Sequence, residues 1–189
     1  HWKKYGNEIK KMILARKAVG VHSESAVQDE GDYNGYRATV TGANGTLILE
    51  LGNRKSSHAG YTEVASGAGY SMWVKPNSPL TPELTITPKS TTYRTSSMSV
   101  TMRALGKLGE STTIYYTVDG SDPMSSNTKR TYTGAITIEG TMTLKAYAES
   151  IYGKSAVQTH VYTYDPPQEL PITIAFQKPD SWSNVYLYS

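Results

Sequence analysis

At residues 142–149 the chain reads MTLKAYAE. The even-numbered residues of this stretch are apolar (Met, Leu, Ala, Ala), and the odd-numbered ones are polar or amphipathic (Thr, Lys, Tyr, Glu). Because successive side chains of an extended chain point to opposite faces, the alternation predicts a β-strand with one buried face. Short runs of this kind, separated by turn residues, recur from residue 36 to residue 164. The sequence therefore predicts a mainly β protein.

The strand at 142–149 is one of a series in residues 83–164. Turn residues recur there at the spacing of a β-sandwich, so we predict about seven short strands. The candidate strands share β-branched or aromatic residues and lie at 84–87, 98–104, 113–118, 135–138, 142–149 and 157–164.

Two carboxylates stand close together in the segment DGSDP at residues 119–123. Asp119 and Asp122 could form the carboxylate pair of a glycosidase or contribute to a calcium site. Asp and Gly are also dominant turn residues. We favour a structural turn over the calcium and catalytic alternatives.

Upstream, two hairpins are expected. Segments 36–40 and 47–51 flank Gly-Ala-Asn-Gly at 42–45, and segments 61–65 and 70–74 flank Ser-Gly-Ala-Gly at 66–69. Such turns join antiparallel strands, so the pattern predicts a compact antiparallel sheet. Asn44-Gly45-Thr46 also matches a glycosylation acceptor, although the hairpin explains the Asn-Gly pair more simply.

The pattern of residues 1–19 predicts an α-helix, the one segment of the chain with a strong helical pattern. Trp2, Tyr5, Ile9, Met12 and Ile13 fall on one face at helical spacing. Positive charge is concentrated in the second half of this segment, where it complements the helix dipole, and a glycine at position 20 favours termination. We expect residues that precede this chain to cover the apolar face, and thus expect the chain to begin inside a longer polypeptide.

The C-terminal twenty residues hold the strongest candidate binding site. Two strands are expected at 172–176 and 185–188, too few for a stable domain, so we expect the module to continue beyond the chain. Tyr186 and Tyr188 are two residues apart and share one face of a strand. Two exposed rings in line, with Trp182 nearby, form a platform on which sugars can stack. The alternative is that the Tyr face is buried.

Composition excludes several other classes of function. The formal charge of +3 is too small to indicate a nucleic-acid surface, and no apolar run is long enough to span a membrane. The chain has no Cys, and its four His are scattered without metal-site spacing. We therefore assign no catalytic residue and no metal ligand in this chain.

Three parts of the sequence resemble parts of one kind of enzyme, in the same order. The helix at 1–20, with its Arg-Lys pair at 16–17 and terminal Gly, resembles the last barrel helix of α-amylases in glycoside hydrolase family 13. Segments 36–40, 46–51 and 69–74 are similar to the C-terminal β domain that follows that helix.

The remaining parts resemble accessory modules of secreted bacterial glycosidases. The segment IYYTVDGSDP at 114–123, with shorter matches up to residue 155, resembles the chitobiase C-terminal-like domain, a small immunoglobulin-like sandwich. Residues 172–188 resemble the opening strand pair of a family 26 starch-binding module. In that family, aromatic residues of the second strand help to stack on α-glucan, and the resemblance places this role on Tyr186 and Tyr188.

The resemblance implies a division into a helix, β units and linkers. The parts are the last barrel helix (1–22), the C-terminal β domain (23–75), a linker (76–82), the immunoglobulin-like sandwich (83–164), a second linker (165–169) and the start of the starch-binding module (170–189).

The implied function is that of an accessory region of a secreted bacterial α-amylase, a retaining glycoside hydrolase. The region itself would stabilise the barrel, space the modules and target starch, and its partners would be α-glucan and the upstream barrel. Catalytic carboxylates and any family calcium site would lie upstream, so no cofactor is expected in this chain. The alternative is a non-catalytic cell-surface protein, built of β modules, that binds glycans or mediates adhesion.

Overall fold

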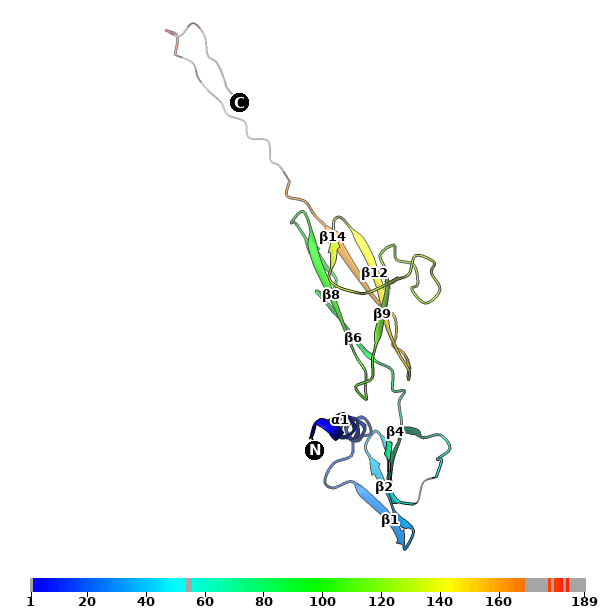
Figure 1. The fold of residues 1–189 in the computed structure, drawn as a ribbon. Helices are drawn as coiled ribbons and strands as arrows, with labels where there is room; N and C mark the ends of the chain where they lie inside the picture. Colours follow the sequence, from blue (N-terminus) through cyan, green and yellow to red (C-terminus); the bar gives the residue numbers. More distant parts are fainter. Residues whose placement is uncertain (1, 54–55, 169–176, 178, 182, 184–189) are drawn as a thin grey trace.

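The computed structural model describes residues 2–53, 56–168, 177, 179–181 and 183. These residues form one α-helix and fourteen β-strands, arranged as two β units that follow one another along the molecule (Figure 1). The expected fold class, mainly β with one N-terminal helix and antiparallel sheets, is confirmed for this part of the chain.

The first unit is a five-stranded antiparallel sheet with a helix on one face. Its strands are ordered β1-β2-β3-β5-β4 across the sheet. The elements are α1 (Trp2–Ala18), β1 (Ala26–Asp32), β2 (Gly35–Gly42), β3 (Gly45–Gly52), β4 (Thr62–Gly67) and β5 (Tyr70–Pro76).

Both expected hairpins are present in this sheet. Gly42 pairs with Gly45 at the end of β2 and β3, and Gly67 pairs with Tyr70 at the end of β4 and β5. Strand β1 was not expected from the sequence. All of its residues are exposed, so it lacks the alternation of buried and exposed positions that predicts a strand. It is an edge strand held by its backbone ladder to β2.

Helix α1 packs on the sheet through its small residues. Ala15 and, just after the helix, Val19 are fully buried against the sheet, with Met12 beside them. Ile9 and Ile13 of the predicted apolar face are 37% and 49% exposed. The expectation that residues preceding this chain cover that face stays a prediction.

The second unit is a two-sheet β-sandwich. One sheet is ordered β10-β9-β12-β14-β7 with β13 beside β12, and the other is ordered β11-β8-β6. The elements are β6 (Glu83–Thr87), β7 (Thr91–Tyr93), β8 (Met98–Leu105), β9 (Thr113–Thr117), β10 (Arg130–Thr131), β11 (Ile136–Ile138), β12 (Met142–Ser150), β13 (Gly153–Lys154) and β14 (Gln158–Tyr164).

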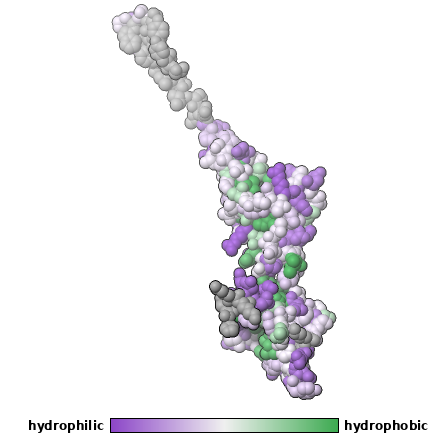
Figure 2. Space-filling model, viewed as in Figure 1, coloured by the Kyte–Doolittle hydropathy of each residue, from purple (hydrophilic) through white to green (hydrophobic). Residues whose placement is uncertain are grey.

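The alternating stretch forms the central strand β12, as predicted. Leu144, Ala146 and Ala148 are fully buried between the two sheets. Tyr147, on the other face, is also buried, because the Tyr115 ring lies 5.4 Å away. Figure 2 shows small hydrophobic areas surrounded by hydrophilic residues on the visible face of both units.

The two units share a small apolar junction. Leu80, from the segment after β5, and Leu108, from the loop after β8, are buried in the same cluster as Ala15 of α1 and Val19, which follows the helix. Tyr152 packs against this cluster from the turn between β12 and β13. The segment predicted to be a linker, 76–82, thus contains Leu80, which packs in this cluster.

Candidate functional site

The C-terminal aromatic platform lies outside the described residues. This applies to Trp182, Tyr186 and Tyr188, and to the strands expected at 172–176 and 185–188. Their proposed role in stacking on sugars stays a prediction.

The Asp119 segment is a self-contained turn. The Asp119 carboxylate accepts hydrogen bonds from the Ser121 hydroxyl and amide, and from the Thr128 hydroxyl at 2.7 Å. Hydrogen bonds from Ser121 and then Thr128 lower the pKa of Asp119 to about 2. Asp122 accepts from the amide of Met124, at 2.9 Å. Each carboxylate thus stabilises its own loop, and no group of three or more His, Cys, Asp or Glu residues suited to a metal occurs among the described residues.

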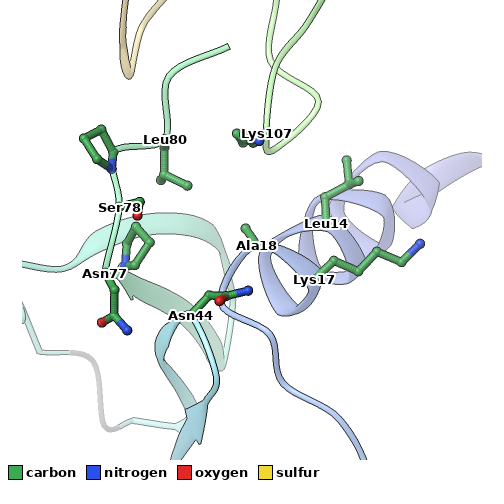
Figure 3. A pocket seen from close by; sticks show the side chains of 10 residues that line it. Leu14, Lys17, Ala18, Asn44, Asn77, Ser78, Leu80 and Lys107 are labelled. Atoms are coloured by element: carbon green, nitrogen blue, oxygen red, sulfur yellow. The ribbon is translucent and has the colours of Figure 1, made fainter. Parts of the chain in front are cut away.

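A groove follows the junction between the two units (Figure 3). It has a volume of about 410 Å³ and is lined by α1, the segment after β5 and Lys107 of the second unit. Leu14 and Ala18 of the helix line it, with Lys17 at its side. The groove contains no aromatic side chain or carboxylate, so it offers neither a stacking surface nor an acid–base group.

The sheet face opposite α1 carries a buried carboxylate. Glu50 of β3 is 1% exposed. Arg37 of β2 donates to its Oε1 from Nε at 2.9 Å and from Nη2 at 2.8 Å. The Ser56 amide and hydroxyl donate to it from the β3–β4 loop, and the Ser71 hydroxyl donates to Oε2 at 3.0 Å. His58 Nε2 lies 3.2 Å from Oε1.

These donors decide the protonation state of Glu50. Burial raises the pKa of Glu50, but hydrogen bonds from Arg37, Ser56 and Ser71 outweigh burial and lower the pKa to about 2. The carboxylate is therefore ionised at neutral pH and is hydrogen-bonded on both oxygens. A carboxylate with no free lone pair directed at solvent is suited to hold a structure in place rather than to transfer protons.

An aromatic side chain extends this network towards the surface. The Trp73 indole Nε1–H donates to Ser71 Oγ at 3.1 Å, and the His58 ring meets the indole edge-on at a centroid distance of 5.4 Å. Glu50, His58 and Trp73 were not singled out from the sequence, because they lie on separate strands and loops. Only the register of β3 against β5, which pairs Ile48 with Trp73, brings them together.

Comparison with known proteins identifies similarities for two segments. Residues 2–67 match the family model described as glucan 1,4-alpha-maltotetraohydrolase, domain C. Residues 105–162 match the family model described as Fn3 associated. Neither match bears on the resemblance to a chitobiase C-terminal-like domain or to a family 26 module, and both resemblances stay predictions.

Two curated relatives are similar to about a third of the chain. Both are named glucan 1,4-alpha-maltotetraohydrolase; one is from Stutzerimonas stutzeri, with 39% identity over 64 residues, and the other is from Roseateles saccharophilus, with 38% identity over 64 residues. Each alignment covers 34% of this chain and 11% of the relative.

A solved structure also overlaps with the chain at low similarity. It is described as the extracellular domain of a hybrid two component system, BT3049, from B. thetaiotaomicron, with 13% identity and a TM-score of 0.30. The overlap covers 80% of this chain and 27% of that chain, and the TM-score is too low to indicate a shared fold.

No helix among the described residues is long and apolar enough to cross a membrane. Residues 2–67 are thus similar to domain C of an amylase, and the chain spans about a tenth of the length of the curated relatives it matches.

Proposed function

We propose that this chain is the C-terminal accessory region of a secreted amylase that hydrolyses α-1,4-glucosidic bonds of starch. The match of residues 2–67 to an amylase domain C carries the proposal. Helix α1 and the sheet behind it share one core, so the matched segment is a folded unit rather than a set of unrelated elements. The catalytic nucleophile and general acid that such a reaction requires belong upstream of this chain.

The exposed side of α1 supports docking on an upstream catalytic barrel. Ile9 and Ile13 are one helical turn apart, so they share a face. This face is turned by roughly 120° from the stripe of Ala15 and Val19 that packs on the sheet. A helix with apolar residues in both directions is typical of one that lies between two layers. We assign the second layer to the barrel.

The junction between the β units supports a spacing role for the second unit. Leu80 and Leu108 are 8% and 3% exposed, and both pack with α1 rather than with the core of the sandwich. This contact orients the second unit relative to the first. A module held in this way would carry the following residues, including Trp182, Tyr186 and Tyr188, away from the barrel and towards polymeric starch outside the cell.

Affinity electrophoresis tests the starch-targeting part of this proposal. We expect the chain to migrate more slowly in a native gel that contains soluble starch than in one without it, because exposed aromatic rings stack on glucan. A Trp182→Ala/Tyr186→Ala/Tyr188→Ala variant should be retarded much less than the wild type. Equal retardation in a gel that contains a β-linked glucan, or a triple variant retarded as strongly as the wild type, would contradict the assignment.

Light scattering tests the docking face of α1. With no barrel present, we expect the chain to self-associate through Ile9 and Ile13, and an Ile9→Lys/Ile13→Lys variant to be monomeric at the same concentration. Ile151→Lys is the matched control, because Ile151 is 82% exposed on the second unit, and it should associate like the wild type. A wild-type chain that stays monomeric at high concentration would favour the alternative of a non-catalytic surface protein.

A further inference from the structure

Strand β4 presents two polar side chains beside Trp73 because of a bulge. The register of β4 against β5 shifts between Glu63 and Ala65. Val64 and Ala65 are consecutive, yet both are buried in the core under α1. A bulge that places two successive residues on one face re-aims the residues that flank it. Glu63, opposite Trp73, and Ser66, which pairs with Ser71, are therefore both directed to the outer face of the sheet.

These side chains surround a cavity on the outer face. Its volume is about 380 Å³, in the range of pockets that hold small ligands. It is lined by one indole, one carboxylate and four hydroxyl side chains, from residues Ser56, Ser57, Glu63, Ser66, Ser71 and Trp73. No Lys, Arg or His side chain is among the residues that line it. A single carboxylate is too few for a metal site.

The aromatic wall of this cavity is held in place before any ligand arrives. The Trp73 indole nitrogen donates to Ser71 Oγ, and Ser71 in turn donates to the buried Glu50 carboxylate. The His58 ring, at an interplanar angle of 75°, supports the indole from the side. A ring fixed by such contacts loses little conformational freedom on binding, which favours affinity.

The remaining polar side chains are available to a ligand. Ser56 and Ser71 are engaged with Glu50, but the side chains of Ser57, Glu63 and Ser66 make no hydrogen bond to any other described residue. Glu63 and Ser66 are exposed at the mouth of the cavity. A carboxylate can accept two hydrogen bonds from adjacent hydroxyl groups of a ligand, and serine hydroxyls can donate or accept.

We propose that this cavity is a subsite for one sugar residue of a neutral glucan chain. The apolar face of a pyranose ring would stack on Trp73, and its hydroxyl groups would donate to Glu63 and exchange hydrogen bonds with Ser57 and Ser66. Glu63 disfavours anionic ligands, and a purely apolar ligand would leave the polar lining desolvated and unpaired. The choice of an α-1,4-linked glucan rests on the proposed function.

Calorimetric titration of the full chain with maltotetraose tests the subsite. The chain carries Trp182→Ala/Tyr186→Ala/Tyr188→Ala, so that the expected C-terminal platform does not contribute. We expect saturable binding, with Kd raised about tenfold by Trp73→Ala and about fivefold by Glu63→Gln. Tyr33→Ala is the matched control, since Tyr33 is a 97% exposed aromatic residue in the turn between β1 and β2 of the same unit, and it should bind like its parent.

The outcomes separate the subsite from the proposed function. If cellotetraose binds more tightly than maltotetraose, with the same dependence on Trp73 and Glu63, the subsite stands and the α-glucan function fails. If no neutral oligosaccharide binds, or if both variants bind as well as the parent, the subsite is overturned. Trp73→Phe keeps an aromatic face, so partial recovery of affinity in this variant supports stacking, whereas a loss equal to that of Trp73→Ala opposes it.

Discussion

Replacing Glu50 with glutamine is expected to lower the free energy of unfolding of the first β unit by about 3 kcal/mol. Every hydrogen bond that the Glu50 carboxylate accepts comes from the Arg37 guanidinium, the Ser71 hydroxyl, or the amide and hydroxyl of Ser56. Glutamine has the same shape but replaces one acceptor oxygen with an NH₂ group. That group would face N–H or O–H donors, and Arg37 would lose its ion pair with the buried carboxylate and keep the one with Glu30.

Urea denaturation followed by tryptophan fluorescence measures this effect. Trp73 is hydrogen-bonded into the network through Ser71, so a Trp2→Phe/Trp182→Phe background makes it the reporter. Glu30→Gln is the matched control, because Glu30 also pairs with Arg37 but is 54% exposed. An exposed ion pair contributes less than about 1 kcal/mol. Equal losses in the Glu50 and Glu30 variants would show that burial of the carboxylate does not matter.

The same carboxylate makes stability depend on pH. The pKa of Glu50 is lowered from 4.5 to about 2 in the folded chain. Ionised Glu50 therefore stabilises the fold fully above pH 4.5, and this contribution is lost as the pH falls from about 4.5 to about 2. We expect the stability difference between the wild type and Glu50→Gln to shrink over that window. A constant difference, measured by urea denaturation at several pH values, would contradict the lowered pKa.

Local patterns in the sequence predicted most of the fold. Leu144, Ala146 and Ala148 alternate with larger side chains, and a two-sided burial pattern of this kind requires a strand. Gly42 and Gly45 end their strands in a two-residue turn, a geometry with a strong sequence signal. Strand β1 had no such signal. Its residues are all exposed and show no alternation of buried and exposed positions, and its backbone pairing with β2 defines it.

The candidate site was less predictable because it depends on contacts between distant residues. Glu50 and Ser71 are 21 residues apart, and only the pairing of β3 with β5 brings them together. Charged residues are rarely buried, so nothing in the run of Leu and Ile around Glu50 indicates a buried carboxylate. The bulge between Glu63 and Ala65 leaves no clear pattern either, since Val64 and Ala65 look like ordinary strand residues.

Replacing Gly42 with alanine is expected to detach helix α1 from its sheet and to cost about 2–4 kcal/mol. Gly42 ends strand β2 directly beneath the end of the helix. An added Cβ would overlap the Val19 carbonyl oxygen and would lie 2.7 Å from the carbonyl carbon of Gly20. These are backbone atoms, which cannot rotate away as a flexible side chain would, so the helix end itself would have to move.

The displaced helix end is tied to the sheet by hydrogen bonds that would be lost with it. The Asn44 amide donates to the Val19 carbonyl oxygen at 3.0 Å, and the Ala43 amide donates to the Gly20 carbonyl oxygen at 3.3 Å. Separation would also expose Val19, which is fully buried. A helix of 17 residues is marginally stable alone in water, so α1 should unfold when it detaches.

Far-UV circular dichroism during urea denaturation measures this loss directly, because α1 is the one α-helix among the described residues. Gly134→Ala is the matched control: no atom lies within 4 Å of the added Cβ there, and Gly134 is not among the glycines with positive φ. Its unfolding should match that of the wild type. A Gly42→Ala chain with unchanged helicity and stability would mean that the end of α1 can shift without breaking its contact with the β2–β3 turn. In that case the helix would be a loosely attached element, and its assignment as the rigid connection between the sheet and an upstream barrel would fail.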